Sequence, residues 1–299
     1  MRSIPERRLG LGTAQFGLAY GATNVRGRVS IREARRIIGL AREAGIHVLD
    51  TAAAYGESEG VLGSLAEEVK DFRIVTKTIP IASQTITTVE TKQVTDALNA
   101  SRRHLKRPML DAVLVHHGKT LLHPGGERIV ESLSEEKTRG TISKIGVSVY
   151  DPTELESIIP MFVPDIVQFP VNLLDQRFPQ SGALSRLKAA GTELHARSLF
   201  LQGTLLVSPR ELPPALAAGH SKYARVADFA AVNKLSPLVA CLSYGFSIQE
   251  IDCMILGVTG VDELMAILTA LRDLPHRVPD MSALAVADLN IIDPSRWRI

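Results

Sequence analysis

The feature of this sequence that most restricts its fold is an eightfold alternation of a short apolar run with an amphipathic stretch. The runs are apolar over their whole length rather than at every second position, which is typical of parallel strands buried on both faces. They lie at Leu9–Leu11, Ile46–Leu49, Phe72–Thr76, Leu110–Val115, Ile145–Val149, Ile166–Phe169, Thr192–Ala196 and Cys253–Gly257. Eight such units predict a single-domain (β/α)8 TIM barrel over residues 1–299. An open, doubly wound α/β sheet is the competing architecture.

The stretches between these runs carry the 3.6-residue spacing of helices. Ala34, Ile37, Ile38 and Ala41 form one apolar stripe, which Ser30 and Glu33 would open as a capping box. Val61, Leu62, Leu65, Ala66 and Val69 form a second stripe, and further helices are predicted over 91–106, 126–138, 152–159, 181–190, 221–246 and 261–272. Two irregular segments, near 79–89 and 199–220, would be long loops at the mouth of the barrel.

Composition and charge exclude several classes of function. The net charge is only +2 and the basic residues are scattered, so nothing points to nucleic acid. Cys241 and Cys253 have neither the number nor the spacing of a disulfide scaffold or a zinc site, and we expect no metal. No apolar run is long enough to span a membrane, and MRSIPERRLG lacks the apolar core of a signal peptide. The sequence predicts a cytoplasmic protein, a monomer or weak homo-oligomer, that acts on a small molecule.

Polar side chains stand where three consecutive apolar runs end. Asp50 ends the second run and Tyr55 lies in the loop beyond it, Lys77 ends the third, and His116 follows the fourth. Because the carboxyl ends of parallel strands gather at one end of a barrel, these four groups should meet there. They suit proton transfer to a carbonyl oxygen: Tyr55 would donate the proton and Lys77, held charged by Asp50, would lower the pKa of Tyr55. His116 would orient the carbonyl, and a cofactor must supply the hydride because none of these groups can.

These segments resemble, in order, those of the aldo-keto reductases. LGLGTAQFG is similar to the family's first barrel strand, LDTAAAYG to its Asp–Tyr segment, IVTKT to its lysine strand and LDAVLVHHG to its histidine strand. KIGVSVY, DIVQFPVN and ILGVTGVDEL resemble its cofactor-side segments, so the likeness runs from about residue 9 to about residue 270 and suggests a bacterial member. It implies that Asp50, Tyr55, Lys77 and His116 are catalytic. The implied reaction is hydride transfer between NAD(P)H and the carbonyl of an aldehyde, ketone or aldose.

The resemblance also implies how the nicotinamide cofactor binds across the barrel mouth. Ser148 and Gln168 match positions that hydrogen-bond the carboxamide, and Arg197 replaces an aromatic residue under the nicotinamide ring. The other implied cofactor-binding residues are Thr13, Gln15, Asp50, Ser198, Leu199, Gly257, Val258, Thr259 and Glu263. The basic residues that grip the 2′-phosphate of NADP are not found, and Glu263 would repel a phosphate while accepting a bond from a ribose hydroxyl. The resemblance to the family therefore favours NADPH only slightly over NADH as the cofactor.

Phe16, Tyr20 and His117 are expected around the substrate. The chain is only 5% aromatic, and Gln15 and Arg197 add polarity to the mouth. These residues favour a polyol, an aldose or another oxygenated carbonyl over a steroid. The same site would serve the reverse reaction, as an NAD-dependent aldose or alcohol dehydrogenase.

Other interpretations of the same residues remain open. Asp50 and Lys77 would suit a purely structural ion pair, and a Schiff-base aldolase would use a desolvated Lys77. A non-catalytic relative that only binds cofactor would keep the same residues. His116 and His117 would suit a metal site, although adjacent strand residues point to opposite faces. His195 is expected to be a hydrogen-bonded core histidine and Asp111 a hydrogen-bond partner at a strand start.

Overall fold

The structure is a computed structural model that describes residues 5–297. Its parallel strands are β1 (Leu9–Gly12), β2 (Val48–Asp50), β3 (Arg73–Lys77), β4 (Leu110–Val115), β5 (Ile142–Ser148), β6 (Ile166–Pro170), β7 (Glu193–Arg197) and β8 (Cys253–Gly257). Each strand pairs with the next, and β8 returns to pair with β1 between Met254–Gly257 and Leu9–Gly12. The predicted closed barrel is confirmed, and the open sheet is wrong because no strand is left with an unpaired edge.

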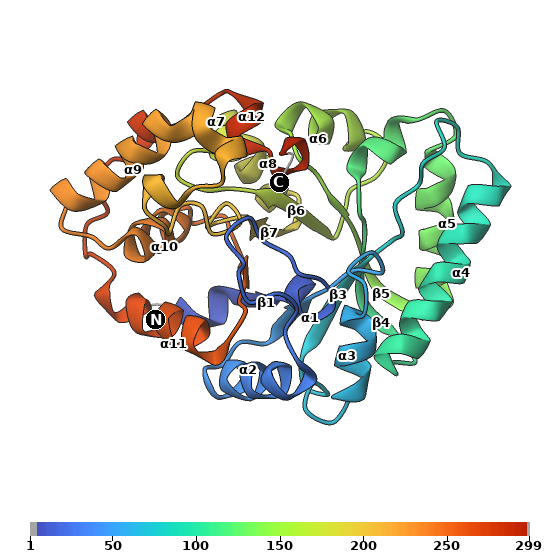
Figure 1. Cartoon of the computed structure of the whole chain (residues 1–299). Coiled ribbons are helices and arrows are strands. Elements are labelled where there is room, and N and C mark those ends of the chain that lie inside the picture. Colours follow the sequence, from blue (N-terminus) through green and yellow to red (C-terminus); the bar gives the residue numbers. More distant parts are fainter. Residues whose placement is uncertain (1–4, 298–299) are drawn as a thin grey trace.

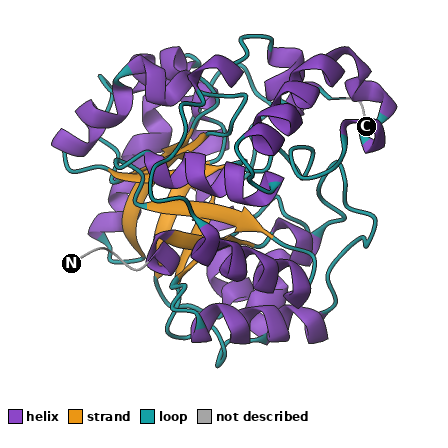
Figure 2. Ribbon diagram, turned by 90° about the vertical axis from the view of Figure 1, so that its left-hand side faces the viewer, coloured by secondary structure: helices purple, strands orange, loops and turns teal. Residues whose placement is uncertain are grey.

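Helices surround the strands, as Figure 2 shows. The α-helices are α1 (Ala14–Gly17), α2 (Ile31–Glu43), α3 (Ser58–Ser64), α4 (Thr88–Leu105), α5 (Glu127–Thr138), α6 (Pro152–Ile158), α7 (Arg177–Ser181), α8 (Ala183–Ala189), α9 (His220–Val232), α10 (Pro237–Ser247), α11 (Val261–Ala270) and α12 (Leu289–Ile292) (Figure 1). Short 3-10 helices are η1 (Pro5–Arg8), η2 (Gly118–Leu122), η3 (Pro209–Glu211), η4 (Pro214–Gly219), η5 (Leu271–Asp273), η6 (Ser282–Leu284) and η7 (Pro294–Arg296).

The helix predicted over 221–246 is wrong, because two helices occupy that stretch. Lys234 has a left-handed backbone (φ 56°), which ends α9, and Ser236 then caps α10 by accepting from Val239 N. Pro237 follows at the first helical position, where it needs no hydrogen bond. Within residues 5–297 no single helix is long and apolar enough to cross a membrane. The segment Pro214–Val232 passes that test only together with Pro237–Ser247, to which it is bent by 91°.

Two local predictions near the start of the chain also need correction. Ser30 accepts a hydrogen bond from Glu33 N, but the Glu33 carboxylate does not complete the capping box. Instead Glu33 accepts from Val261 N at 2.9 Å and so ties α2 to the start of α11. The helix that carries the second apolar stripe is shorter than the stripe. It ends at Ser64, and Leu65 and Val69 are buried in the turns that follow.

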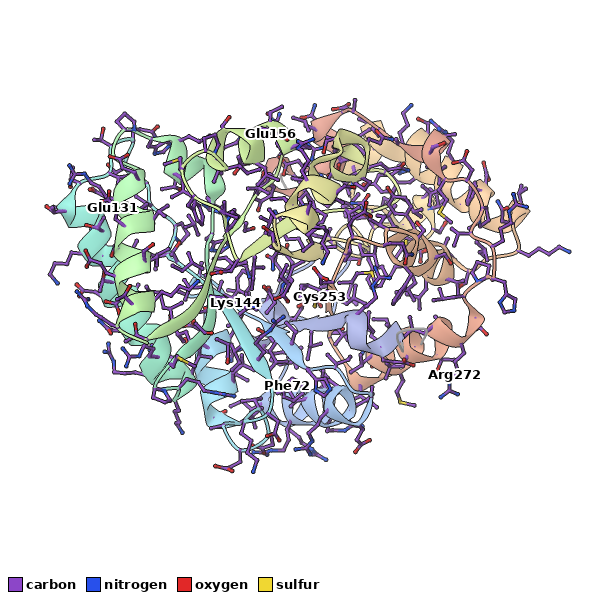
Figure 3. The ribbon with its side chains drawn as sticks, turned by 180° about the vertical axis from the view of Figure 1, so that it is seen from behind. Phe72, Glu131, Lys144, Glu156, Cys253 and Arg272 are labelled. Carbon is purple, nitrogen blue, oxygen red and sulfur yellow. The ribbon has the colours of Figure 1, made fainter. Side chains whose placement is uncertain are left out.

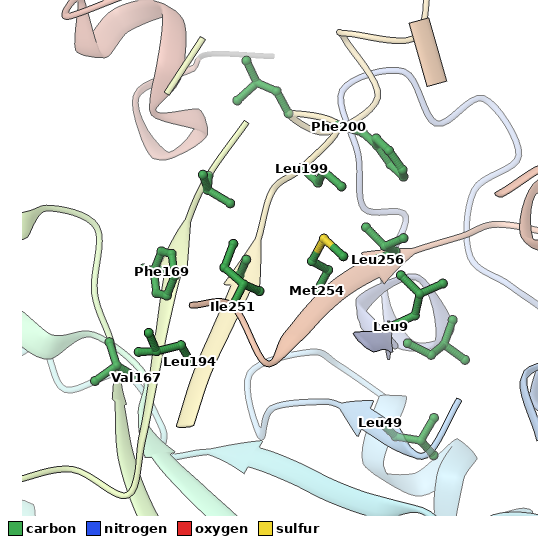
Figure 4. Close-up of a cluster of buried hydrophobic side chains, with 14 of the residues drawn as sticks. Leu9, Leu49, Val167, Phe169, Leu194, Leu199, Phe200, Ile251, Met254 and Leu256 are labelled. Atoms are coloured by element: carbon green, nitrogen blue, oxygen red, sulfur yellow. The ribbon is translucent and has the colours of Figure 1, made fainter. Parts of the chain in front are cut away.

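Apolar side chains fill the space between strands and helices, and Figure 4 shows part of this core around β6, β7 and β8. A separate small cluster is formed by Val75 of β3, Ala112 and Leu114 of β4, and Ile166 of β6. Cys241 and Cys253 are free and fully buried, as expected of packing residues. Ile74 N donates to the Asp111 carboxylate at 2.9 Å, so the predicted role of Asp111 at a strand start is confirmed.

Charged residues lie at or near the amino ends of three odd-numbered strands. Glu193 of β7 accepts from Arg73 Nη1 of β3 at 2.8 Å and from Lys144 Nζ of β5 at 2.9 Å. Lys144 lies among the strands in Figure 3. His195 is fully buried and its Nε2 lies 2.7 Å from the Glu193 carboxylate, whereas its Nδ1 has no partner among the described residues. The prediction of a hydrogen-bonded core histidine therefore holds for one ring nitrogen. Because these residues lie at the amino ends of the strands, their cluster is at the opposite end of the barrel from Asp50 and Lys77.

Candidate active site

A buried ion pair joins the carboxyl ends of β2 and β3. Lys77 Nζ lies 2.7 Å from Asp50 Oδ2 and donates to Thr51 O at 2.8 Å, and the Lys77 side chain is 1% exposed. Gln168 Nε2 of β6 donates to Asp50 Oδ1 at 2.6 Å. Both carboxylate oxygens of Asp50 are therefore engaged, and its charge is matched by the ammonium beside it. Burial lowers the pKa of Lys77, and Asp50 opposes that shift.

Tyr55 and His116 stand against this pair. Lys77 Nζ lies 4.9 Å from the centroid of the Tyr55 ring, on its face. The rings of Tyr55 and His116 meet edge to face, with centroids 5.7 Å apart and planes at 83°. His116 N donates to Thr78 Oγ1, and its Nδ1 has no partner among the described residues. The structure thus brings the acid, the phenol, the ammonium and the imidazole into one cluster.

The protonation states in this cluster follow from burial. The pKa of Tyr55 lies well above its usual value because the phenol is desolvated and faces the negative charge of Asp50, while Arg197 opposes the shift. We expected Lys77 to lower the pKa of Tyr55, but burial and Asp50, which pairs with Lys77 at 2.7 Å, outweigh any such lowering. Burial, with the Lys77 cation next, lowers the pKa of His116 to about 3. At neutral pH, Tyr55 is a protonated phenol and His116 a neutral imidazole.

A close backbone contact fixes the position of Tyr55. A Cβ added to Gly17 would lie 1.7 Å from Tyr55 O and 2.5 Å from Ser58 N, so only glycine lets α1 approach this loop. Ser58 Oγ is buried and donates to Thr13 O at 2.8 Å. Thr13 Oγ1 in turn donates to Asp50 O at 2.9 Å. Thr13, predicted to contact the cofactor, instead ties β1 to the Tyr55 loop, because its fully buried side chain is bonded away from the cavity.

A cavity of about 450 Å³ opens beside the cluster. At one end it is lined by Asp50, Tyr55, Lys77 and His116, and at the other by Thr259 and Glu263 near the start of α11. Most predicted cofactor and substrate residues line it as well: Gln15, Tyr20, Ser148, Gln168, Arg197, Ser198, Leu199, Gly257 and Val258. The structure therefore places one continuous cavity over the carboxyl ends of the barrel strands.

Two predicted substrate residues do not line this cavity. Phe16 is wholly buried in the core, so its ring cannot reach a ligand. His117 is exposed, and its ring packs on His116 with centroids 4.8 Å apart. The premise that the two histidines point to opposite faces is wrong because β4 ends at Val115, before either of them. No cluster of three His, Cys, Asp or Glu side chains suited to a metal occurs among residues 5–297.

Loop residues that the sequence motifs did not single out complete the walls. The segment from Leu199 to Val207 lines the cavity, whereas the loop near 79–89 contributes no lining residue to it. Thr23 Oγ1 donates to Gln202 O at 3.3 Å, and a Cβ on Gly203 would meet Thr23 at 2.1 Å. Leu201 and Gln202 have positive φ angles of 46° and 55°, unusual for residues other than glycine. The loops after β1 and β7 thus meet at the cavity.

Arg197 and Tyr150 form a stacked pair in the cavity wall. Arg197 Cζ lies 4.2 Å from the centroid of the Tyr150 ring, and Arg197 Nη2 donates to Val149 O at 3.2 Å. Arg177 Nη2 holds the loop by donating to Tyr150 O at 3.1 Å. Tyr150 was not predicted as a site residue, although it directly follows the β5 segment that carries Ser148. Its position just beyond the end of a strand was the sequence signal that could have identified Tyr150 as a site residue.

A closed (β/α)8 barrel with an Asp–Lys pair, a phenol and an imidazole at its carboxyl end defines a class of barrel proteins with a site for acid–base chemistry. The family model described as "Aldo/keto reductase family" matches residues 8–284. The chain belongs to that family of oxidoreductases, as its motifs suggested.

Among curated relatives, an aldo-keto reductase from Mycobacterium sp. (strain MCS) is 32% identical over 164 residues, 50% of this chain and 53% of that protein. Oxidoreductase sirO from Leptosphaeria maculans is 26% identical over 211 residues, 67% of this chain and 62% of its own. The matched segments thus span only 53% and 62% of these two relatives.

Solved structures share the fold over almost the whole chain. The aldo-keto reductase AKR11C1 from Bacillus halodurans (holo form) superposes with a TM-score of 0.73 at 20% identity, covering 97% of this chain and 95% of that one. The glycerol dehydrogenase AKR11B4 from Gluconobacter oxydans gives 0.69 at 18% identity, covering 96% and 92%. At these identities the likeness concerns the fold.

Proposed function

We propose that this protein transfers a hydride between NAD(P)H and the carbonyl carbon of an aldehyde, ketone or aldose. The observation that carries the proposal is the cluster of Tyr55, His116 and the buried Asp50–Lys77 pair at one end of the cavity. Hydride delivery to a carbonyl leaves negative charge on its oxygen, which needs a proton donor and hydrogen bonds. A protonated Tyr55 is such a donor, and the neutral His116 imidazole is a second hydrogen-bonding group beside it.

The Asp50–Lys77 pair would hold the Tyr55 ring in place beside the reacting carbonyl. Lys77 Nζ lies against the Tyr55 ring while Asp50 and Thr51 O fix the ammonium. This pairing also argues against a Schiff-base aldolase, because such a lysine must become neutral to attack a carbonyl. Lys77 would have to leave two acceptors before it could react.

The residues present fit a nicotinamide cofactor, which would supply the hydride. Gln168 Oε1 and Arg197 Nε are buried without partners among residues 5–297, one an acceptor and the other a donor. A carboxamide offers the matching donor and acceptor, and Ser148 pairs with Gln168 across β5 and β6. The cavity of about 450 Å³ is in the range typical of cofactor and ligand sites. Gln168, Ser148 and Arg197 would hold the carboxamide end.

We further propose an oxygenated substrate, such as a polyol or aldose, because Tyr20, Gln15 and Gln202 make the loop walls polar. Gln202 Nε2 lies 3.3 Å from the Tyr20 hydroxyl, so these groups are already arranged for hydrogen bonding. The same groups would serve oxidation of a sugar or alcohol by NAD. The direction would then be set by the concentrations of the cofactor forms, since Tyr55 passes the same proton either way.

The test replaces Tyr55 with Phe and follows NAD(P)H oxidation with DL-glyceraldehyde and 4-nitrobenzaldehyde. Turnover should fall by about 10²–10⁴-fold, while the dissociation constant of the reduced cofactor changes little. Unchanged turnover would overturn the role of Tyr55. Cofactor binding without multiple turnovers in the wild type would identify a non-catalytic relative, and borohydride trapping of substrate on Lys77 without nicotinamide would identify an aldolase.

A further inference from the structure

The end of the cavity farthest from Tyr55 is bordered by a fixed carboxylate. Glu263 lines the cavity, and its two oxygens accept from Thr259 N and Thr259 Oγ1, each at 2.6 Å. These two bonds hold the carboxylate at the start of α11 while leaving each oxygen able to accept another donor. The cationic lining residues, Lys77 and Arg197, both belong to the Tyr55 end. Glu263 is therefore the charged side chain that a ligand meets at this end.

An arginine near this end, Arg26, is occupied by another carboxylate. Arg26, from the loop between β1 and α2, donates to Asp262 through Nη1 at 2.8 Å and Nη2 at 2.6 Å. The pair lies across Gly260, where an added Cβ would meet Arg26 Nη1 at 2.6 Å and Asp262 Oδ1 at 2.4 Å. Asp262 is the main cause of the raised pKa of Arg26, and the charges of Glu263 and Glu33 add to it. A bidentate pair leaves this arginine little capacity for another anion.

The direction in which a dinucleotide lies follows from the proposed function, on which this inference rests. Its nicotinamide must reach the carbonyl carbon whose oxygen meets Tyr55, so an extended dinucleotide places its adenosine at the Thr259 and Glu263 end. NADP differs from NAD by a phosphate on the adenosine ribose, which adds about two negative charges at neutral pH. A carboxylate at this position accepts a bond from the ribose hydroxyls of NAD and repels that phosphate.

We propose that this chain selects NADH over NADPH, with Glu263 as the specificity-determining residue and Asp262 withholding Arg26 from the phosphate. This proposal differs from the slight preference for NADPH that the family resemblance suggested. The reason is spatial: the sequence shows Glu263 but not that Thr259 clamps it against the cavity, nor that Arg26 is bound by Asp262. NADH should bind roughly tenfold or more tightly than NADPH, the size of one screened charge contact near a protein surface.

The experiment titrates the full chain with NADH and with NADPH by fluorescence, at low and at near-physiological salt. Glu263→Gln should strengthen NADPH binding several-fold, because the neutral amide no longer repels the phosphate, and should weaken NADH binding, because an amide accepts less strongly from the ribose hydroxyls than a carboxylate does. Asp262→Asn should also strengthen NADPH binding, through the released Arg26, and adding Arg26→Ala should abolish that gain. Higher salt should narrow the difference between the two cofactors, since exposed charges are screened.

The matched control is Asp96→Asn. Asp96 pairs with Lys92 at 2.7 Å, and its side chain is 62% exposed, the same fraction as that of Asp262. This control should change neither dissociation constant. Tighter binding of NADPH by the wild type, or an unchanged cofactor ratio in Glu263→Gln, overturns the selectivity alone. Binding of neither dinucleotide overturns the proposed function and the selectivity with it.

Discussion

Replacement of Gly17 with alanine tests whether the backbone contact beneath Tyr55 controls the reaction. The new Cβ would start 1.7 Å from Tyr55 O, and such contacts are essentially never below 3.0 Å, so the carbonyl must move by at least about 1.3 Å. Ser58 N at 2.5 Å and Glu57 N at 2.9 Å are backbone as well, so no side-chain rotation can relieve the overlap. Because a misplacement near 1 Å can cost about 10²-fold in rate, kcat should fall by roughly that factor.

The assay compares kcat, the dissociation constant of the reduced cofactor, and urea unfolding. The overpacked variant should also lose about 1–3 kcal/mol of unfolding free energy, so rates are corrected for the folded fraction. Gly39 of α2 and Gly60 of α3 are the matched controls, since an added Cβ at either has nothing within 4 Å. Gly39→Ala should stabilise the fold by about 0.5–1 kcal/mol and leave kcat unchanged. A folded Gly17→Ala variant with wild-type kcat would refute the reasoning.

Three further perturbations address the charged groups. Asp50→Asn or Lys77→Met leaves one buried charge without its partner. Each variant should therefore lose about 3–5 kcal/mol of unfolding free energy, measured by urea unfolding. The double variant should recover part of this loss. Losses below about 1 kcal/mol would contradict a buried pair. Glu193→Gln removes the carboxylate that pairs with Arg73 and Lys144 at the amino end of the barrel, so stability should fall. The kcat should stay within about twofold, because the candidate active site lies at the carboxyl ends of the strands. The pKa of His116 falls from 6.5 to about 3 on folding, so the folded state binds fewer protons between these values and stability is lost as pH falls through that window. His116→Gln should flatten this loss between pH 6.5 and about pH 4 in urea titrations, and an unchanged slope would show that His116 is not the group responsible.

The barrel and its reacting cluster could be predicted because they depend on strand ends. Asp50 and Lys77 close β2 and β3, and parallel strands bring their carboxyl ends together whatever the loops do. The strands themselves could be predicted because parallel strands buried on both faces are apolar over their whole length. What joins the cluster into a rigid unit depends on contacts between distant segments: Gln168 reaches Asp50 across 118 residues of sequence. A resemblance of motifs suggested a role for Gln168, but not this bond.

The incorrect site residues share one cause. Thr13 and Phe16 stand beside a strand end in the sequence, yet one is bonded to the backbone of β2 and the other is buried in the core. Proximity to a strand end does not determine the direction of a side chain once the strand stops alternating, as His116 and His117 also show. Tyr150 is the opposite case: it was not predicted as a site residue, yet it lies beyond β5, lines the cavity and stacks on Arg197.

Whether a cation lowers the pKa of Tyr55 depends on where the nearest carboxylate lies, and not only on the cation being present. Lys77 lies against the Tyr55 ring, but Asp50 is 2.7 Å from its ammonium and itself raises the pKa of Tyr55. Arg197 donates only to neutral oxygens, Val149 O and Ser198 Oγ, and among the groups acting on Tyr55 it is the one that lowers the pKa. The sequence argument assigned the lowering of this pKa to Lys77, whereas Arg197 is the cation that opposes its rise. Because Arg197 hydrogen-bonds neutral oxygens rather than a carboxylate, its charge would favour a negative Tyr55 oxygen as the proton leaves.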